Sequence, residues 1–164
     1  GMVASIFHIL SHAATKSLLF ISAIGLTDVS KGSRKFQDLT GAAYRHKIAG
    51  IGFTVGSLSM VGMPLFSGFV SKLLFAQASI GHAYKMLPAL IVLGISTILN
   101  AIYFMKTVIR IFVPERRSDC EVITIKSEKT YALTIVLFIA LNIALGMLSQ
   151  PIVEWIKMGL DMFA

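Results

Sequence analysis

Long apolar stretches alternate with short polar segments along this chain. A helix that crosses a bilayer needs about 20 predominantly apolar residues, so the long stretches predict membrane-spanning helices. A closing segment carries Glu154, Lys157 and Asp161 on one helical face with Trp155 among apolar neighbours, a pattern typical of a helix in the membrane interface. We therefore predict an all-α membrane protein with a transmembrane domain and an amphipathic tail helix. The predicted spans are 2–26, 48–80, 88–113 and 130–149, within a domain at 1–149, and the tail helix is 150–164.

The second predicted span is interrupted by the sequence GMPLFSGF at 62–69. Pro64 lacks a backbone donor and clashes with the preceding turn, and the glycines at 62 and 68 permit irregular backbone. Each flanking piece is shorter than the ~20 residues that a complete span needs. We therefore expect one discontinuous span rather than two separate ones.

The distribution of Lys and Arg supports this topology. Most of the fifteen basic residues lie in two segments, 31–47 and 106–129. One broken span puts both segments on the same side, as the positive-inside rule favours, whereas two complete spans would separate them. We predict that loops 27–47 and 114–129 are cytoplasmic, with a short surface helix near 33–43. The tail helix then lies on the outer side of the cytoplasmic (inner) membrane.

Composition favours the same class. The chain is 55% hydrophobic and 14% charged, with a mean hydropathy of +0.79, whereas soluble domains carry about 25% charged residues. Membrane topology explains the net charge of +7, so we expect no nucleic-acid partner. Cys120 alone supports neither a disulfide framework nor a metal site. No signal peptide is visible, and because the chain opens inside a span we expect a fragment or a split subunit.

Ionisable side chains occur within the apolar stretches. His8, His12 and Lys16 lie at i, i+4 and i+8 of FHILSHAATKSLLF, on one helical face. A charged lysine at this depth costs at least ~2.5 kcal/mol and usually faces the bundle interior or a hydrated cavity. The small and hydroxylic residues between them favour a proton relay. The alternative is that Lys16 snorkels to the interface and packing satisfies the histidines.

Lys72 is the second candidate, eight residues beyond Pro64. Unwound backbone near a helix break exposes carbonyls that hold water, and water carries protons between side chains. The alternative is a simple interfacial anchor. Asn100 lies mid-span. It either forms a hydrogen bond to a neighbouring helix, the commoner role, or holds water. The other candidates for holding water or forming the break are Thr54, Ser57, Ser59, Gly62, Pro64, Ser67 and Gly68.

Motifs for other chemistry are missing from the sequence. It contains no nucleotide-binding glycine loop and no nucleophile constellation, and the HxxxH at His8 and His12 is not the HExxH of zinc enzymes. We therefore predict no catalytic residue, no cofactor and no metal.

Two motifs resemble a known family. FHILSHAATKSLLF resembles the FHLxNHALFKALLF stretch of antiporter-like membrane subunits, and GMPLFSGFVSK resembles their GIPPLSGFxSK stretch. These subunits belong to respiratory complex I, Mrp-type cation/proton antiporters and membrane-bound hydrogenases. The interval between Lys16 and Lys72 also fits, and LGMLSQPIVEW is similar to the family's closing span and lateral turn. Leu65 stands where the family has a second proline, and Ser11 replaces an asparagine.

The resemblance implies a fold of two inverted repeats, each with a broken helix. This chain is similar to the last part of that fold and contains most of the second repeat. The equivalents of His8, His12 and Lys16 belong to a hydrated central axis in the family, and the equivalent of Lys72 ends it near the outer exit.

The implied function is proton translocation, with cation/proton antiport as an option, in a multisubunit redox-driven or antiporter complex. The implied partners are other membrane subunits, a chain or segment that supplies the first repeat, the lipid bilayer, protons and, as an option, Na⁺. Any enzymatic role would be membership of an NADH:quinone oxidoreductase-type translocase. The alternative is a non-conducting, structural piece that only packs in such a complex.

Overall fold

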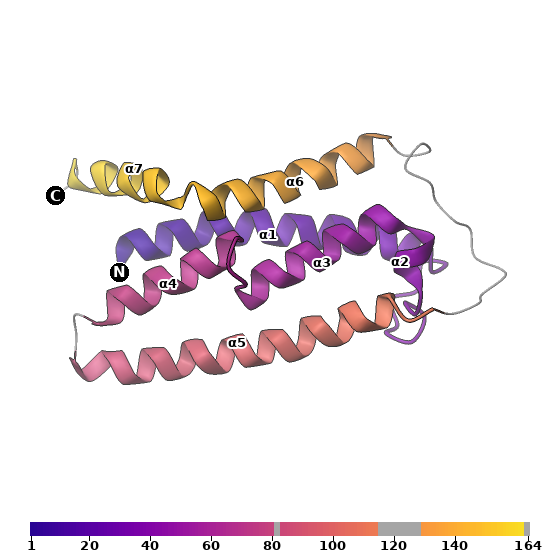
Figure 1. The fold of residues 1–164 in the computed structure, drawn as a ribbon, viewed down its shortest axis with the longest axis horizontal. Helices are drawn as coiled ribbons and strands as arrows, with labels where there is room; N and C mark the ends of the chain where they lie inside the picture. Colours follow the sequence, from indigo (N-terminus) through magenta and orange to yellow (C-terminus); the bar gives the residue numbers. More distant parts are fainter. Residues whose placement is uncertain (81–82, 115–128, 163–164) are drawn as a thin grey trace.

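The structure is a computed structural model, and it describes residues 1–80, 83–114 and 129–162, with residues 83–85 described by backbone alone. These ranges are helical and contain no strand. The helices, coloured along the chain in Figure 1, are α1 (Met2–Asp28), α2 (Ala42–Arg45), α3 (Lys47–Val61), α4 (Ser67–Ile80), α5 (Ala83–Ile111), α6 (Lys129–Met147) and α7 (Ser149–Asp161).

Helices α1 and α5 run nearly the length of the molecule, whereas α3 and α4, like α6 and α7, follow one another to cover a similar length (Figure 1). The segments Met2–Asp28, Met86–Ile111 and Lys129–Met147 are long and apolar enough to cross a membrane. Helix α3 is apolar but shorter. The prediction of an all-α membrane protein with one discontinuous helix is confirmed, and the chain is an integral membrane protein.

The two ends of the bundle differ. The connection from α1 to α3, the end of α5 and the start of α6 lie at one end, while the N-terminus and α7 lie at the other (Figure 1). Both predicted cytoplasmic loops therefore adjoin the same end, although residues 115–128 of the second loop, with Cys120, lie outside the described residues. Which end faces the cytoplasm stays a prediction.

Glycines let α3 approach its neighbours closely. A Cβ atom at Gly56 would lie 2.8 Å from Leu19 of α1. A Cβ atom at Gly52 would lie 2.8 Å from Ile135 of α6 and would also collide with the Ser22 hydroxyl. The two positions explain why α3 fits between α1 and α6.

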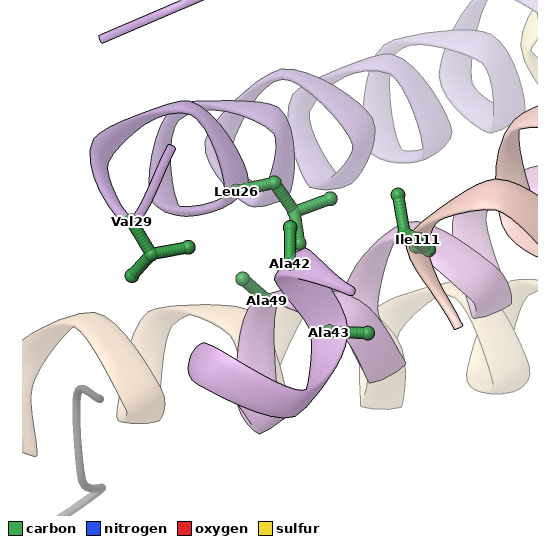
Figure 2. Close-up of a cluster of buried hydrophobic side chains, with 6 residues drawn as sticks. All are labelled: Leu26, Val29, Ala42, Ala43, Ala49 and Ile111. Atoms are coloured by element: carbon green, nitrogen blue, oxygen red, sulfur yellow. The ribbon is translucent and has the colours of Figure 1, made fainter. Parts of the chain in front are cut away.

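The predicted surface helix at 33–43 is wrong. Residues 33–41 contain turns, and the short helix α2 is buried at Ala42 and Ala43. Gly32 and Gly41 have positive φ values of 72° and 68°, which interrupt a continuous helix. Figure 2 shows the apolar cluster that α2 joins: Leu26, Val29, Ala42, Ala43, Ala49 and Ile111.

Arg45 holds this connection together. Its guanidinium group donates to the carbonyl oxygens of Val29 and Thr40 at 3.1 Å each and to the Ser30 hydroxyl at 3.2 Å. The side chain is 6% exposed. A buried arginine with three oxygen acceptors explains why the segment turns inward.

Two other boundaries differ from the prediction. Helix α5 begins at Ala83, so Pro88 lies inside it rather than in its first turn. A proline removes one backbone hydrogen bond, and the helix continues on both sides of that gap. Helix α7 begins at Ser149, has no buried residue and leaves Trp155 69% exposed. Its place in the membrane interface stays a prediction.

Candidate functional site

The helix break forms a sharp corner between α3 and α4. Helix α3 ends at Val61, and Gly62 takes a left-handed conformation with φ of 90°. Leu65 also has a positive φ, of 93°, which is unusual for a residue with a side chain. Pro64 lies between them and is exposed. The backbone therefore leaves the helical path at 62–66, as the sequence predicts.

Lys72 points from α4 back into this corner. Its Nζ donates to the Val61 carbonyl oxygen at 2.7 Å and to the Thr97 hydroxyl of α5 at 2.9 Å. A Cβ atom on Gly62 would lie 3.0–3.3 Å from the Lys72 side chain. The ammonium group thus lies at the C-terminal end of α3, where the helix dipole favours a positive charge.

A cavity of about 390 Å³ adjoins Lys72. This volume and its polar groups suit several water molecules. Residues from α1, α3, α4 and α5 surround it, and they include six predicted site residues. The lining consists of His8, Ser11, His12, Thr15, Ser59, Met60, Gly68, Ser71, Lys72, Phe75, Val92, Leu93, Ser96 and Asn100.

The two histidines lie together on the α1 side of the cavity. Their ring centroids are 5.3 Å apart. His8 Nδ1 and the Ser71 hydroxyl share a hydrogen bond of 2.7 Å, and the His8 ring also contacts the edge of Phe75 at 5.5 Å. Since Ser71 precedes Lys72 in α4, the structure brings His8, His12 and Lys72 to one site.

Lys16 is absent from the lining of this cavity. Its Nζ lies 5.9 Å from the ring centroid of Phe20, a side chain that is 66% exposed. Each step of four residues turns about 40° beyond a full circle, so two steps from His8 carry Lys16 off the cavity face.

The predicted hydroxyl residues divide into two groups. Thr54 and Ser57 donate to carbonyl oxygens of their own helix, those of Gly50 and Phe53, at 2.8 and 2.7 Å, and neither lines the cavity. Ser59 does line it, and Ser67 lies buried directly behind the wall.

Asn142 of α6 is a polar residue that sequence reasoning missed. It is fully buried, and its amide oxygen lies within hydrogen-bond distance of the hydroxyls of Thr15, Ser59 and Ser67. The signal was available, because a lone asparagine in the apolar stretch LFIALNIALG resembles Asn100 in its own span. Within the part of the chain that the structure describes, no three His, Cys, Asp or Glu side chains gather as a metal site would require.

The broken helix, with a lysine folded onto its first half and a histidine-lined cavity beside it, defines a helical membrane protein with ionisable side chains inside its bundle. The family model described as "NADH:quinone oxidoreductase/Mrp antiporter, TM" matches residues 1–106. The chain therefore belongs to this family.

Relatives from both branches of the family are similar to the chain. The A1 subunit of a Na(+)/H(+) antiporter from Staphylococcus haemolyticus is 30% identical over 94% of this chain and 21% of its own length. The N subunit of NADH-quinone oxidoreductase from Saccharopolyspora erythraea is 24% identical over 97% of this chain and 30% of its own length. The A/B subunit of a probable K(+)/H(+) antiporter from Rhizobium meliloti is 40% identical over 49% of this chain and 8% of its own length. The chain thus spans less than a third of each relative.

Proposed function

We propose that this chain forms part of the proton path of a multisubunit cation/proton antiporter or quinone-reductase complex in the cytoplasmic membrane. The observation that carries the proposal is the cavity that holds His8, His12 and Lys72 beside the helix break. Titratable groups within a membrane bundle are costly and mark proton or ion pathways. The family's named relatives, which include antiporter and quinone-reductase subunits, support the same conclusion.

The proton moves between imidazole nitrogens, the Ser71 hydroxyl, cavity water and the Lys72 amine. His8 Nδ1 already shares a hydrogen bond with Ser71, so a hydroxyl can accept a proton on one side as it releases one on the other. The Lys72 ammonium is held by two neutral oxygens, which stabilise the charge without neutralising it. A charge that moves nearby then decides whether Lys72 keeps or gives up its proton.

In this proposal, Lys16 lies where this chain meets the rest of the proton path. The same side of α1 exposes Phe20 and Ile24, and a lysine among exposed apolar groups is unfavourable in lipid. We propose that a chain or segment supplying the first repeat covers this side of α1 and continues the path through Lys16. Loops 27–47 and 114–129 face the cytoplasm in this arrangement, and Lys72 lies toward the outer exit.

Proton flux through the intact complex in sealed vesicles tests the proposal. We expect Lys72→Ala and Lys16→Ala to abolish flux while the complex still assembles. Lys106→Ala is the matched control, because Lys106 is exposed near the loop end of α5 and, among the described residues, its ammonium group contacts the Phe36 ring, at 5.7 Å, and lies outside the cavity. If both site variants conduct as well as the control, the relay is refuted and the alternative of a non-conducting packing subunit holds.

A further inference from the structure

Asn142 joins four helices through one oxygen atom. Its Oδ1 lies 2.8 Å from the Thr15 hydroxyl of α1, 3.0 Å from the Ser59 hydroxyl of α3 and 3.0 Å from the Ser67 hydroxyl of α4. Its Nδ2 donates to the Phe138 carbonyl oxygen of its own helix at 3.3 Å. Ser59 and Ser67 lie on opposite sides of the helix break, so the bonds to Asn142 tie the two half-helices together.

Two further contacts complete this group. Ser11 donates to Ser67 at 2.9 Å, and the hydroxyls of Thr15 and Ser59 are 3.1 Å apart. We call these five residues the Asn142 cluster: Ser11, Thr15, Ser59, Ser67 and Asn142. Each member is at most 3% exposed.

The hydrogen atoms of the Asn142 cluster can be counted. Each hydroxyl has one hydrogen to donate, and an amide oxygen has two lone pairs. The three hydroxyls around Oδ1 therefore cannot all donate to it at once. Every hydroxyl hydrogen is used in one arrangement. Ser67 donates to one lone pair of Oδ1, and Ser11 donates to Ser67. Either Thr15 or Ser59 donates to the second lone pair, and the other of the two donates to that hydroxyl. All four hydroxyl hydrogens are then used inside the Asn142 cluster.

This arrangement determines whether the lining hydroxyls act as donors or as acceptors toward the cavity. Ser11, Thr15 and Ser59 line the cavity, whereas Ser67 and Asn142 lie behind it. Because their hydrogens are used inside the Asn142 cluster, the three lining hydroxyls present only lone pairs to the cavity. These three hydroxyls can accept hydrogen bonds from water, from the histidine rings or from the Lys72 ammonium group in the same cavity, and they have no hydrogen to donate into it.

We infer that Asn142 is a positioning residue that fixes the α3–α4 joint against α1 and makes the cavity hydroxyls acceptors. Ser11, Thr15 and Ser59 then accept hydrogen bonds from cavity water and from the proton-carrying groups of the lining. This inference deepens the proposed function, and its effect on transport rests on that function, whereas its structural part stands alone.

Thermal unfolding of the purified chain in detergent tests the structural part by a double-mutant cycle. We expect Asn142→Leu to lower Tm by several degrees, because it leaves buried hydroxyls without an acceptor. Thr15→Val should lower Tm in the parent chain. It should lower Tm by less in the Asn142→Leu background, where the amide oxygen of Asn142 is already absent. The matched control is Thr134→Val, which removes an α6 hydroxyl that bonds only to the Thr130 carbonyl oxygen of its own helix.

Additive losses in this cycle would overturn the inference. If Asn142→Leu does not fold, a milder cycle of Thr15→Val with Ser59→Ala replaces it. Because Thr15 and Ser59 share the Asn142 oxygen, we expect their losses in Tm to be non-additive. Additive losses in Tm would again overturn the inference.

Proton flux in the intact complex tests the second part. We expect Asn142→Leu to lower flux several-fold while Thr134→Val leaves it unchanged. Asn142→Asp should restore flux at acidic pH, because a neutral carboxylic acid keeps both the acceptor and the donor to Phe138, and flux should change as the acid ionises. If Lys72→Ala abolishes flux but Asn142→Leu leaves it unchanged, the claim that Asn142 makes the three lining hydroxyls acceptors is overturned. If Lys72→Ala itself conducts normally, the proposed function fails and the unfolding cycle alone decides the inference.

Discussion

Gly62→Ala tests how the helix break positions Lys72. Gly62 combines a positive φ of 90° with the close approach of the Lys72 side chain. An added Cβ atom would lie 3.0 Å from Lys72 Cδ and 3.2 Å from Nζ. The substitution therefore has two effects: it strains the backbone at position 62, and it displaces the Lys72 side chain.

The two effects differ in size. A residue with a side chain in the left-handed region costs about 1–2 kcal/mol. The contact with Lys72 costs less, because a flexible side chain can move by a few tenths of an ångström. That movement acts on the 2.7 Å bond between Nζ and the Val61 carbonyl oxygen. For a chain of this size, 1 kcal/mol corresponds to roughly 2–4 °C in Tm, so we expect a loss of about 2–8 °C.

Thermal unfolding of the purified chain, followed by circular dichroism in detergent, measures this loss. Gly94→Ala is the matched control, because a Cβ atom there meets nothing within 4 Å and alanine favours a helix over glycine by roughly 0.5–1 kcal/mol. The two substitutions should shift Tm in opposite directions. If Gly62→Ala is as stable as Gly94→Ala, the left-handed corner and the contact with Lys72 are both wrong.

Four further substitutions at three positions probe the corner and its supports, each by the same unfolding measurement. Leu65→Gly should raise Tm, because glycine relieves a φ of 93° worth about 1–3 kcal/mol, whereas Leu65→Pro should lower it, because proline fixes φ near −65°. Thr97→Val should lower both Tm and proton flux by removing an acceptor of the Lys72 ammonium. Arg45→Lys should cost about 1–3 kcal/mol, because an ammonium cannot reproduce the three bonds of the planar guanidinium group.

Matched controls separate these effects from general damage. Thr107→Val removes another α5 hydroxyl, one that bonds the Tyr103 carbonyl oxygen of its own helix, and should match the parent chain. Arg34→Lys replaces an exposed arginine in the same connection as Arg45 and should also be neutral. Equal losses in a test variant and its control would contradict the role assigned to that test residue. A Leu65→Pro variant as stable as the parent would contradict the left-handed conformation at Leu65.

The parts of the site that sequence could predict are those where a residue conflicts with its surroundings. A lysine or a histidine in an apolar helix is costly, so His8, His12 and Lys72 stand out, and they line one cavity. Pro64 between two glycines likewise marks a break that the backbone contains. Lys16 has the same signal but lies off the cavity, because helical drift over eight residues is too large to ignore.

Neutral hydroxyl groups carry no such signal. Ser57 and Ser59 are two residues apart in the same apolar helix, yet Ser57 bonds to its own helix and Ser59 bonds to Asn142 on α6. A hydroxyl in an apolar helix satisfies its hydrogen bond by either route, and the choice depends on which neighbour packs alongside. Sequence alone could not separate them, so Thr54 and Ser57 are predicted near the path together with Ser59, whereas Asn142 was missed despite its signal.

The Lys72 amine is held by neutral oxygens rather than by a carboxylate. In the described ranges, the acidic residues are Asp28, Asp38, Glu154 and Asp161, and they lie at the end of α1, in the following connection and in α7. Lys72 instead bonds to a carbonyl and a hydroxyl oxygen. A carboxylate at this depth would hold the proton of the ammonium group through strong pairing in a low dielectric. Neutral dipoles stabilise a charged lysine less than a carboxylate does, so in the proposed function a nearby charge can more easily shift Lys72 between its two protonation states.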